Sequence, residues 1–367
     1  MAKFDLQIVL DRADRSYKIG EKITGAVRVT VNEDCECRKL TIARQWYASG
    51  HGESDRATPE EEQVIFSGAW RADQTAVYPF ELEAPRGPLS YLGALFNVGW
   101  QLRASADISG VRATTSEDFA LLLGPSSENV RLGILDELPP QVKNPSDKTA
   151  WSYAGGCTRL FAILFGVVLL FVGIPCLILG LSNILAEHFP LSLPISFPAG
   201  RLQSILLIGM GGFFTVLGCI ALLGWFQAAM ARHRLGPVQI EVSPTTLRCG
   251  ETVTCTVRLQ PRGSIKLTEA TVKVAATEHT SPRAGDTDDA PSHASQQTVF
   301  QAHEVLADGR NLPAGEEALL RIAFGIPADA PCTFWGGNNK LIWTVAIELK
   351  LKGWPDWTRI VPITVRP

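Results

Sequence analysis

The sequence contains two long segments without a charged side chain. No Asp, Glu, Lys or Arg occurs from Leu160 to Ala186, and none occurs from Leu202 to Ala231. A helix needs about 20 apolar residues to cross the hydrocarbon core of a bilayer, so both segments are long enough. The core helix of a soluble protein rarely runs so far without a polar face. The absence of charge therefore predicts two transmembrane helices, at about residues 160–183 and 204–226, in a hairpin covering residues 158–231.

The sequence also lacks the residue spacings that mark common catalytic and metal sites. Its eight cysteines are scattered, and Cys176 and Cys219 lie inside the apolar segments. No spacing of Cys and His matches a zinc site or a disulfide framework. None of the six histidines has a catalytic spacing to a Cys, a Ser or a carboxylate, and no glycine-rich phosphate loop joins a strand to a helix. These absences predict a protein that is not an enzyme and that binds no metal or cofactor.

A strong net charge is absent as well. The formal net charge is −3 and the pI is about 6.1, which gives no general attraction to nucleic acid. The first residues, Met1–Ile8, lack the long apolar core of a secretory signal peptide. We therefore expect the first domain in the cytoplasm, where cysteines stay reduced.

Positive charge near the apolar segments lies on their outer flanks. The loop between the segments has only Arg201, whereas basic residues occur on both outer sides. They are Lys143, Lys148 and Arg159 before the first segment, and Arg232 and Arg234 after the second. Cytoplasmic flanks carry the excess of Lys and Arg. The pattern predicts an integral protein of the plasma or inner membrane with both termini in the cytoplasm.

Aromatic side chains mark the same flanks. Trp and Tyr are enriched at membrane–water interfaces, and such residues precede the first segment and end the second. The predicted interfacial anchors are Trp151, Tyr153, Arg159, Trp225, Arg232 and Arg234.

Glycines recur every seven residues in both apolar segments, which puts them on one stripe of each helix. Gly166, Gly173 and Gly180 form the first stripe, and Gly211 and Gly218 form the second. Small residues let helices approach closely in lipid. The stripes predict a tight hairpin or an oligomer seam, although glycine is also common in membrane helices without such a role.

Outside the apolar segments, one pattern of strands and turns occurs twice. Residues 17–31 and 247–259 each contain a Gly-Glu turn followed by a strand of alternating apolar residues. Gly20-Glu21 corresponds to Gly250-Glu251, and Val27-Arg28 corresponds to Val257-Arg258. Because order and spacing recur, the sequence predicts two copies of one β domain.

The correspondence continues late in each copy. Residues 80–93 and 324–336 each run from Phe through Pro to an aromatic residue and Gly. A Trp follows seven residues after that Gly in both copies, at Trp100 and Trp343. Short strands with turn signals about every ten residues and no useful amphipathic helix are typical of β-sandwiches. We predict a mostly β protein with sandwiches at residues 1–126 and 237–367, and a linker at residues 127–157 before the hairpin.

These motifs resemble the arrestin fold family, which includes arrestins, arrestin-domain trafficking adaptors, an arrestin-like retromer subunit and bacterial sporulation-control proteins. The resemblance covers roughly residues 4–125 and 237–367. It implies tandem amino- and carboxy-terminal arrestin-like lobes that bind other proteins. The apolar hairpin stands where family members usually have a short linker. No charged cluster matches the arrestin polar core, so phosphate sensing is not implied.

Two polar loops stand at comparable places in the two copies. They are His51–Glu62 and Thr280–Ser292, and both contain several acidic residues. Such carboxylates bind a cation or a basic partner in some proteins, but exposed hairpin tips are more often solvated.

Two functions fit this organisation. The first is a membrane-anchored, non-enzymatic scaffold or adaptor whose partners are the lipid bilayer and a protein. The alternative is an accessory subunit of a larger membrane complex, which the glycine stripes and Pro175 favour because both suit helix–helix packing. A homo-oligomer is a further expectation from the same stripes.

Overall fold

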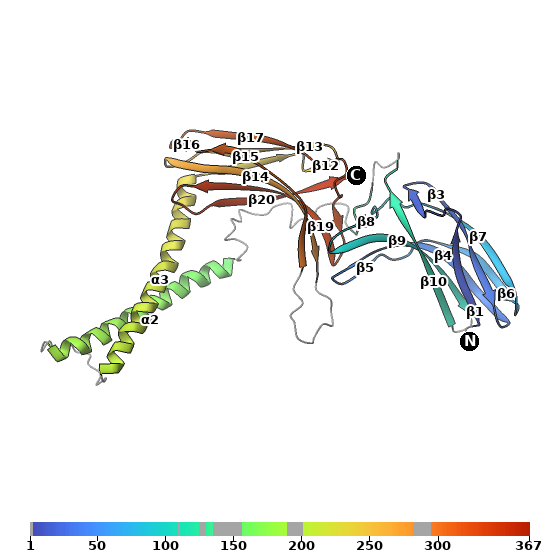
Figure 1. Cartoon of the computed structure of the whole chain (residues 1–367), viewed down its shortest axis with the longest axis horizontal. Helices are drawn as coiled ribbons and strands as arrows, with labels where there is room; N and C mark the ends of the chain where they lie inside the picture. The colour runs from blue at the N-terminus through green and yellow to red at the C-terminus, as the bar shows by residue number, and fades with distance from the viewer. Residues whose placement is uncertain (1–2, 109–110, 125–129, 135–155, 189–200, 282–294) are drawn as a thin grey trace.

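The described residues form two β-rich lobes and two long helices (Figure 1). The computed structural model describes residues 3–108, 111–124, 130–134, 156–188, 201–281 and 295–367. The predicted mostly β class with two sandwich lobes is confirmed.

The amino-terminal lobe consists of a three-stranded sheet packed on a larger sheet. The small sheet has the order β1-β3-β7, and the large sheet runs β2-β10-β9-β4-β5, with β6 paired to β4 and β8 to β9. The strands are β1 (Phe4–Leu10), β2 (Ser16–Lys18), β3 (Lys22–Val31), β4 (Cys35–Gly50), β5 (Asp55–Arg56), β6 (Glu60–Trp70), β7 (Thr75–Glu83), β8 (Tyr91–Leu92), β9 (Phe96–Ile108) and β10 (Val111–Leu122).

The carboxy-terminal lobe repeats this topology. Its sheets run β11-β13-β17 and β12-β20-β19-β14-β15, with β16 paired to β14 and β18 to β19. The strands are β11 (Val238–Ser243), β12 (Thr246–Arg248), β13 (Thr252–Leu259), β14 (Ile265–Thr280), β15 (Ser295–Asp308), β16 (Asn311–Leu312), β17 (Ala318–Gly325), β18 (Phe334–Trp335), β19 (Asn339–Leu351) and β20 (Trp357–Arg366).

Alternating side chains build the core of each lobe. In β3, Val27, Val29 and Val31 are buried between the two sheets, as the alternation predicted. In β13, Val253 and Val257 do the same. Apolar burial of this kind is the main favourable term in folding.

The recurring tryptophan has the same hydrogen bond in both lobes. Trp100 Nε1 donates to the carbonyl oxygen of Pro88 at 2.7 Å, and Trp343 Nε1 donates to that of Pro331 at 2.8 Å. Both tryptophans are fully buried, so each indole N–H needs an internal acceptor. This bond accounts for the twelve-residue interval from Pro to Trp in each copy.

The recurring Gly-Glu turn also has one geometry. Gly20 and Gly250 have φ values of +80° and +88°, a left-handed conformation that glycine adopts without steric cost. The following carboxylate then folds back, and Glu251 Oε2 accepts from the N–H of Arg248 at 2.7 Å. Glu21 makes the equivalent bond to the N–H of Lys18 at 2.9 Å.

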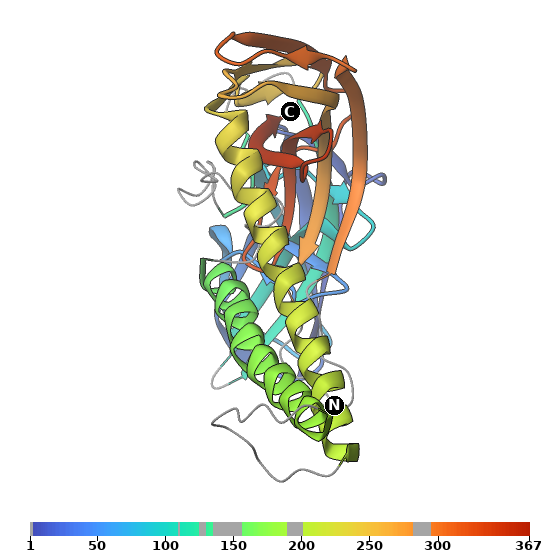
Figure 2. The same cartoon turned by 90° about the vertical axis from the view of Figure 1, so that its left-hand side faces the viewer.

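The helices are α2 (Gly156–His188) and α3 (Arg201–Leu235), which pack against each other (Figure 2). Helix α3 continues directly into the carboxy-terminal lobe, where Leu235 is buried in the core. Gly236, with φ of +69°, ends the helix and donates its N–H to the oxygen of Arg232 at 3.1 Å. The helix end is therefore part of the lobe, and α3 runs beyond residue 231, where we expected the hairpin to end.

Replacing Gly250 by Ala tests the turn geometry. A Cβ there would have only ordinary contacts, the nearest with Ala328 at 3.8 Å, so the cost is conformational. We expect Gly250→Ala to lower the free energy of unfolding by about 1–2 kcal/mol. The measurement is chemical denaturation of the detergent-solubilised chain, followed by tryptophan fluorescence.

Gly325→Ala is the matched control for this substitution. Gly325 lies in β17 without a left-handed φ, and nothing lies within 4 Å of its added Cβ. This variant should be as stable as the parent or slightly more stable. Equal stability of the two variants would contradict the turn argument.

Candidate functional site

The five predicted glycines lie where α2 and α3 touch. A Cβ added to Gly173 would lie 2.7 Å from the backbone N of Thr215, and one added to Gly211 would lie 2.6 Å from that of Leu177. Gly180 and Gly218 are equally close to backbone oxygens of the opposite helix, at 2.9 Å each. Gly166 faces the side chain of Leu222 at 3.3 Å. The two backbones therefore approach closely along most of the hairpin.

The outer surface of the α2–α3 pair is apolar, and the other described residues leave most of it exposed. Both helices are long and apolar enough to cross a membrane, with mean hydropathies of 2.8 for Leu164–Ser182 and 2.4 for Leu202–Leu235. Only 17% and 11% of the residues in their most apolar 18-residue stretches are buried within the chain. Phe171, for example, is 82% exposed. Within the described part of the chain, little else covers these helices.

The predicted interfacial anchors have different surroundings. Trp225 is exposed on α3, and Arg232 is exposed near its end. The guanidinium of Arg234 lies over the ring of Trp354, 5.2 Å from its centroid, so this side chain contacts the carboxy-terminal lobe. Trp151, Tyr153 and the side chain of Arg159 lie outside the described residues.

The two lobes meet at a junction with an aromatic centre. Phe334 of the carboxy-terminal lobe packs against Trp46 and Phe96 of the amino-terminal lobe, with ring centroids 5.7 and 5.6 Å apart. All three rings are buried. Phe334 is the aromatic residue of the repeated segment 324–336, so this repeat contributes directly to the junction.

The carboxylate of Glu278, in the carboxy-terminal lobe, receives its hydrogen bonds from the amino-terminal lobe. It is fully buried at the end of β14. It accepts hydrogen bonds from the N–H of Leu95 at 2.6 Å, from the N–H of Ala94 at 3.2 Å and from the hydroxyl of Tyr91. Burial and this hydrogen bond raise the pKa of Tyr91, so the phenol remains a donor.

Asp55 makes the reciprocal arrangement. This carboxylate of the amino-terminal lobe is 6% exposed. It accepts from the backbone N–H groups of Asn338 and Asn339 and from Asn339 Nδ2, all at 2.8 Å. Asn339 Nδ2 also donates to the oxygen of Glu53 at 2.7 Å. Each lobe thus buries one carboxylate against donors from the other lobe.

These carboxylates are held by neutral donors. No Lys or Arg is buried among the described residues, so no buried cation balances Asp55 or Glu278 there. Burying an ionised carboxylate is costly unless hydrogen bonds replace its water. Here the replacement comes across the junction, which makes the hydrogen bonds specific to this arrangement of lobes.

The sequence contains a signal for Glu278, although this residue was not among the predicted site residues. Val272, Val274 and Ala276 point inward from β14, and Glu278 continues the same alternation. A carboxylate at an inward position of a strand requires a polar partner. That partner lies in another lobe, so the strand pattern alone does not name it.

Around Asp55, the first polar loop packs against the carboxy-terminal lobe and is not solvated. We expected His51–Glu62 to be a solvated tip or a partner-binding loop, but Asp55 within it is buried against the carboxy-terminal lobe. The N–H of Glu53 also donates to the oxygen of Ser281 at 3.2 Å. The two polar loops thus meet each other, while residues 282–292 of the second lie outside the described part of the chain.

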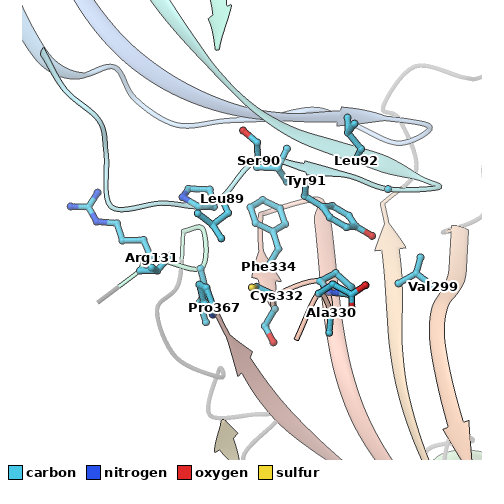
Figure 3. A pocket seen from close by; sticks show the side chains of 18 of the residues that line it. Leu89, Ser90, Tyr91, Leu92, Arg131, Val299, Ala330, Cys332, Phe334 and Pro367 are labelled. Carbon is cyan, nitrogen blue, oxygen red and sulfur yellow. The ribbon is translucent and has the colours of Figure 1, made fainter. Parts of the chain in front are cut away.

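A cavity of about 450 Å³ opens beside the junction (Figure 3). The repeated segments 80–93 and 324–336 both line it, through Ser90 and Tyr91 on one side and Thr333 and Phe334 on the other. Arg131 joins them from a segment that pairs with the carboxy-terminal lobe, where the N–H of Trp335 donates to the oxygen of Leu132 at 2.7 Å. In the described residues no group of three or more His, Cys, Asp or Glu is arranged to hold a metal ion.

No family model matches the chain, and no curated protein matches it. Among solved structures, the chain is similar to the crystal structure of Spo0M, the sporulation control protein from Bacillus subtilis. The TM-score is 0.29 at 17% identity, and the match covers 35% of this chain and 53% of that one, about half of its length. The two lobes share one topology, each with a three-stranded sheet packed on a larger sheet.

Replacing Glu278 by Gln tests the junction. The Gln side chain has nearly the same shape as Glu but carries no charge. Its NH₂ group would face hydrogen-bond donors of the amino-terminal lobe, with which it cannot bond. We expect Glu278→Gln to lower the free energy of unfolding by about 1.5–3 kcal/mol, the range for hydrogen bonds to charged groups. Thermal unfolding of the solubilised chain measures the effect.

The control for Glu278→Gln is Glu304→Gln on the exposed face of β15. Surface substitutions of this kind usually change stability by less than about 0.5 kcal/mol. If both variants unfold at the parent temperature, the junction does not depend on the Glu278 carboxylate.

Replacing Gly173 by Leu tests the contact between α2 and α3. The new side chain would clash with the backbone of α3, so we expect a loss of about 1–3 kcal/mol and a lower melting temperature in detergent. Gly212→Leu is the control, because nothing lies within 4 Å of a Cβ at Gly212. Equal melting temperatures for the two variants would mean that the helices separate in the membrane-mimetic environment.

Proposed function

We propose that this chain is a membrane-anchored, non-enzymatic scaffold or adaptor that presents two arrestin-like lobes at the cytoplasmic face for protein binding. The observation that carries the proposal is the uncovered apolar hairpin whose second helix continues into the core of a lobe. The hairpin anchors the chain, and the lobes are the parts exposed to other proteins.

Physical chemistry favours a bilayer around the hairpin. The largest apolar patch of a soluble monomer is usually about 300–600 Å², whereas here two long apolar helices expose most of their side chains. Helices satisfy their own backbone hydrogen bonds and therefore suit a lipid environment. The absence of charge between residues 164–182 and 202–231 removes the main cost of insertion.

The distribution of basic residues supports a cytoplasmic position for the lobes. Arg232 and Arg234 follow the second span, while the loop between the spans has only Arg201. A hairpin returns the chain to the side from which it entered. Both lobes then lie on the same side of the membrane, and the contacts between the lobes support this arrangement.

The lobes offer surfaces suited to protein binding. Strand β15 (Ser295–Asp308) is 14 residues long and pairs with β14 at one edge of its sheet. No other described strand covers its outer edge. An open strand edge presents backbone donors and acceptors that an extended segment of a partner pairs with.

Selective labelling tests the membrane topology. The variant Ser192→Cys has a new thiol in the connecting loop. We expect a membrane-impermeant maleimide to label this variant on intact cells, and to label the wild-type cysteines only after permeabilisation. Release of the protein by alkaline carbonate, or labelling of wild-type cysteines on intact cells, would count against the proposal.

The accessory-subunit function makes a different prediction. The exposed outer faces of α2 and α3 favour it, because other helices pack there in membrane complexes. A stable heteromeric band in native gels of the mildly solubilised chain supports this function. A scaffold instead migrates as a small species and acquires its partner only after crosslinking.

A further inference from the structure

Two cysteines of the carboxy-terminal lobe face each other. The Sγ atoms of Cys249 and Cys332 are 3.9 Å apart, and both side chains are partly exposed. Cys249 follows β12 at the Gly-Glu turn, and Cys332 lies in the loop before β18. Residues 83 positions apart in the chain are thus brought into thiol–thiol contact by the fold.

The internal repeat shows that packing does not require thiols here. The equivalent positions of the amino-terminal lobe are Ile19, before Gly20, and Leu89, after Pro88. Aliphatic side chains therefore occupy both places in a lobe of the same topology. Only the carboxy-terminal copy has the two thiols, so packing alone does not account for them.

We propose that Cys249 and Cys332 form a redox-active dithiol that reacts with low-molecular-weight disulfides and closes to an intramolecular disulfide. This modification site does not depend on the scaffold function. The geometry supports it because the thiols touch, and because Cys332 lines the solvent-accessible cavity of the junction (Figure 3).

The reaction takes place in two exchange steps. The thiolate of Cys249 attacks one sulfur of the small disulfide, the S–S bond of that molecule breaks, and one small thiolate leaves. Cys332 then loses its proton to solvent and attacks Cys249 Sγ, which expels the second thiolate. The protein loses two electrons and two protons, and the small disulfide is reduced to two thiols.

The surroundings favour Cys249 as the attacking group. The hydrogen bond from Cys332 lowers the pKa of Cys249, while that bond and burial raise the pKa of Cys332. As a thiol, Cys249 donates to the oxygen of Ala330 at 3.3 Å. The thiolate is the reactive form of cysteine, so Cys249 reacts first and Cys332 resolves the mixed disulfide.

Two other cysteines of the lobes are protected. Cys37 and Cys255 are buried, and burial raises the pKa of each to about 11. A buried thiol of raised pKa holds little thiolate near neutral pH and is poorly accessible to a small disulfide. These two cysteines serve as internal references for the selectivity of the reaction.

The disulfide would close beside the junction between the lobes. The sulfurs must move from 3.9 Å to about 2.05 Å, the length of an S–S bond. Rotation of the two side chains, a small shift of their loops, or both bring the sulfurs together. Phe334, which contacts Trp46 and Phe96 of the amino-terminal lobe, lies two residues after Cys332.

The test uses the full chain in detergent micelles, treated with glutathione disulfide, alkylated and analysed by mass spectrometry. Before alkylation, we expect the mass of the chain to fall by two hydrogens. After unfolding and alkylation, a peptide should link Cys249 to Cys332, and Cys37 and Cys255 should be fully alkylated. Dithiothreitol should restore all thiols. Persistence of both thiols, or a linkage between other cysteines, would overturn the proposal.

Single variants separate the roles of the two thiols. Cys332→Ser should accumulate a stable glutathione adduct on Cys249, because the resolving thiol is missing. Cys249→Ser should leave Cys332 mostly free. Equal adducts on both variants would refute the assigned order of attack. The double variant Cys249→Ile/Cys332→Leu, which copies the amino-terminal lobe, should show no change in mass.

Discussion

Each lobe buries a carboxylate for which the opposite lobe supplies the hydrogen-bond donors. Glu278 accepts from the strand β8–β9 region of one lobe, and Asp55 accepts from Asn338 and Asn339 of the other. A buried anion is stable only while such donors remain in place. The relative position of the lobes therefore depends on groups that neither lobe satisfies alone, and the apolar contact of Phe334 adds to them.

The hairpin is joined to this unit through α3. Leu235 at the end of α3 belongs to the core of the carboxy-terminal lobe, and Arg234 lies on Trp354. In the proposed membrane orientation, the direction of α3 thus sets the position of the carboxy-terminal lobe. The junction then sets that of the amino-terminal lobe.

Local patterns predicted much of the fold for a physical reason. Strand alternation, the Gly-Glu turn and the interval to Trp100 and Trp343 each depend on neighbours within about twenty residues or on their own backbone. The junction does not. From the sequence alone, Asp55 looks like any acidic residue of a polar loop, and Glu278 looks like a charged residue at an inward strand position. Their hydrogen-bond donors lie in the other lobe.

The sequence by itself determined the two β domains, their repetition and the two apolar helices, because periodicity and hydrophobicity are properties of local segments. Only the tertiary structure decided how these parts combine. It brought Cys249 to Cys332 across 83 residues, and it faced the glycines of α2 toward α3. It also buried each junction carboxylate against the opposite lobe, since such contacts depend on where distant segments meet and not on their own composition.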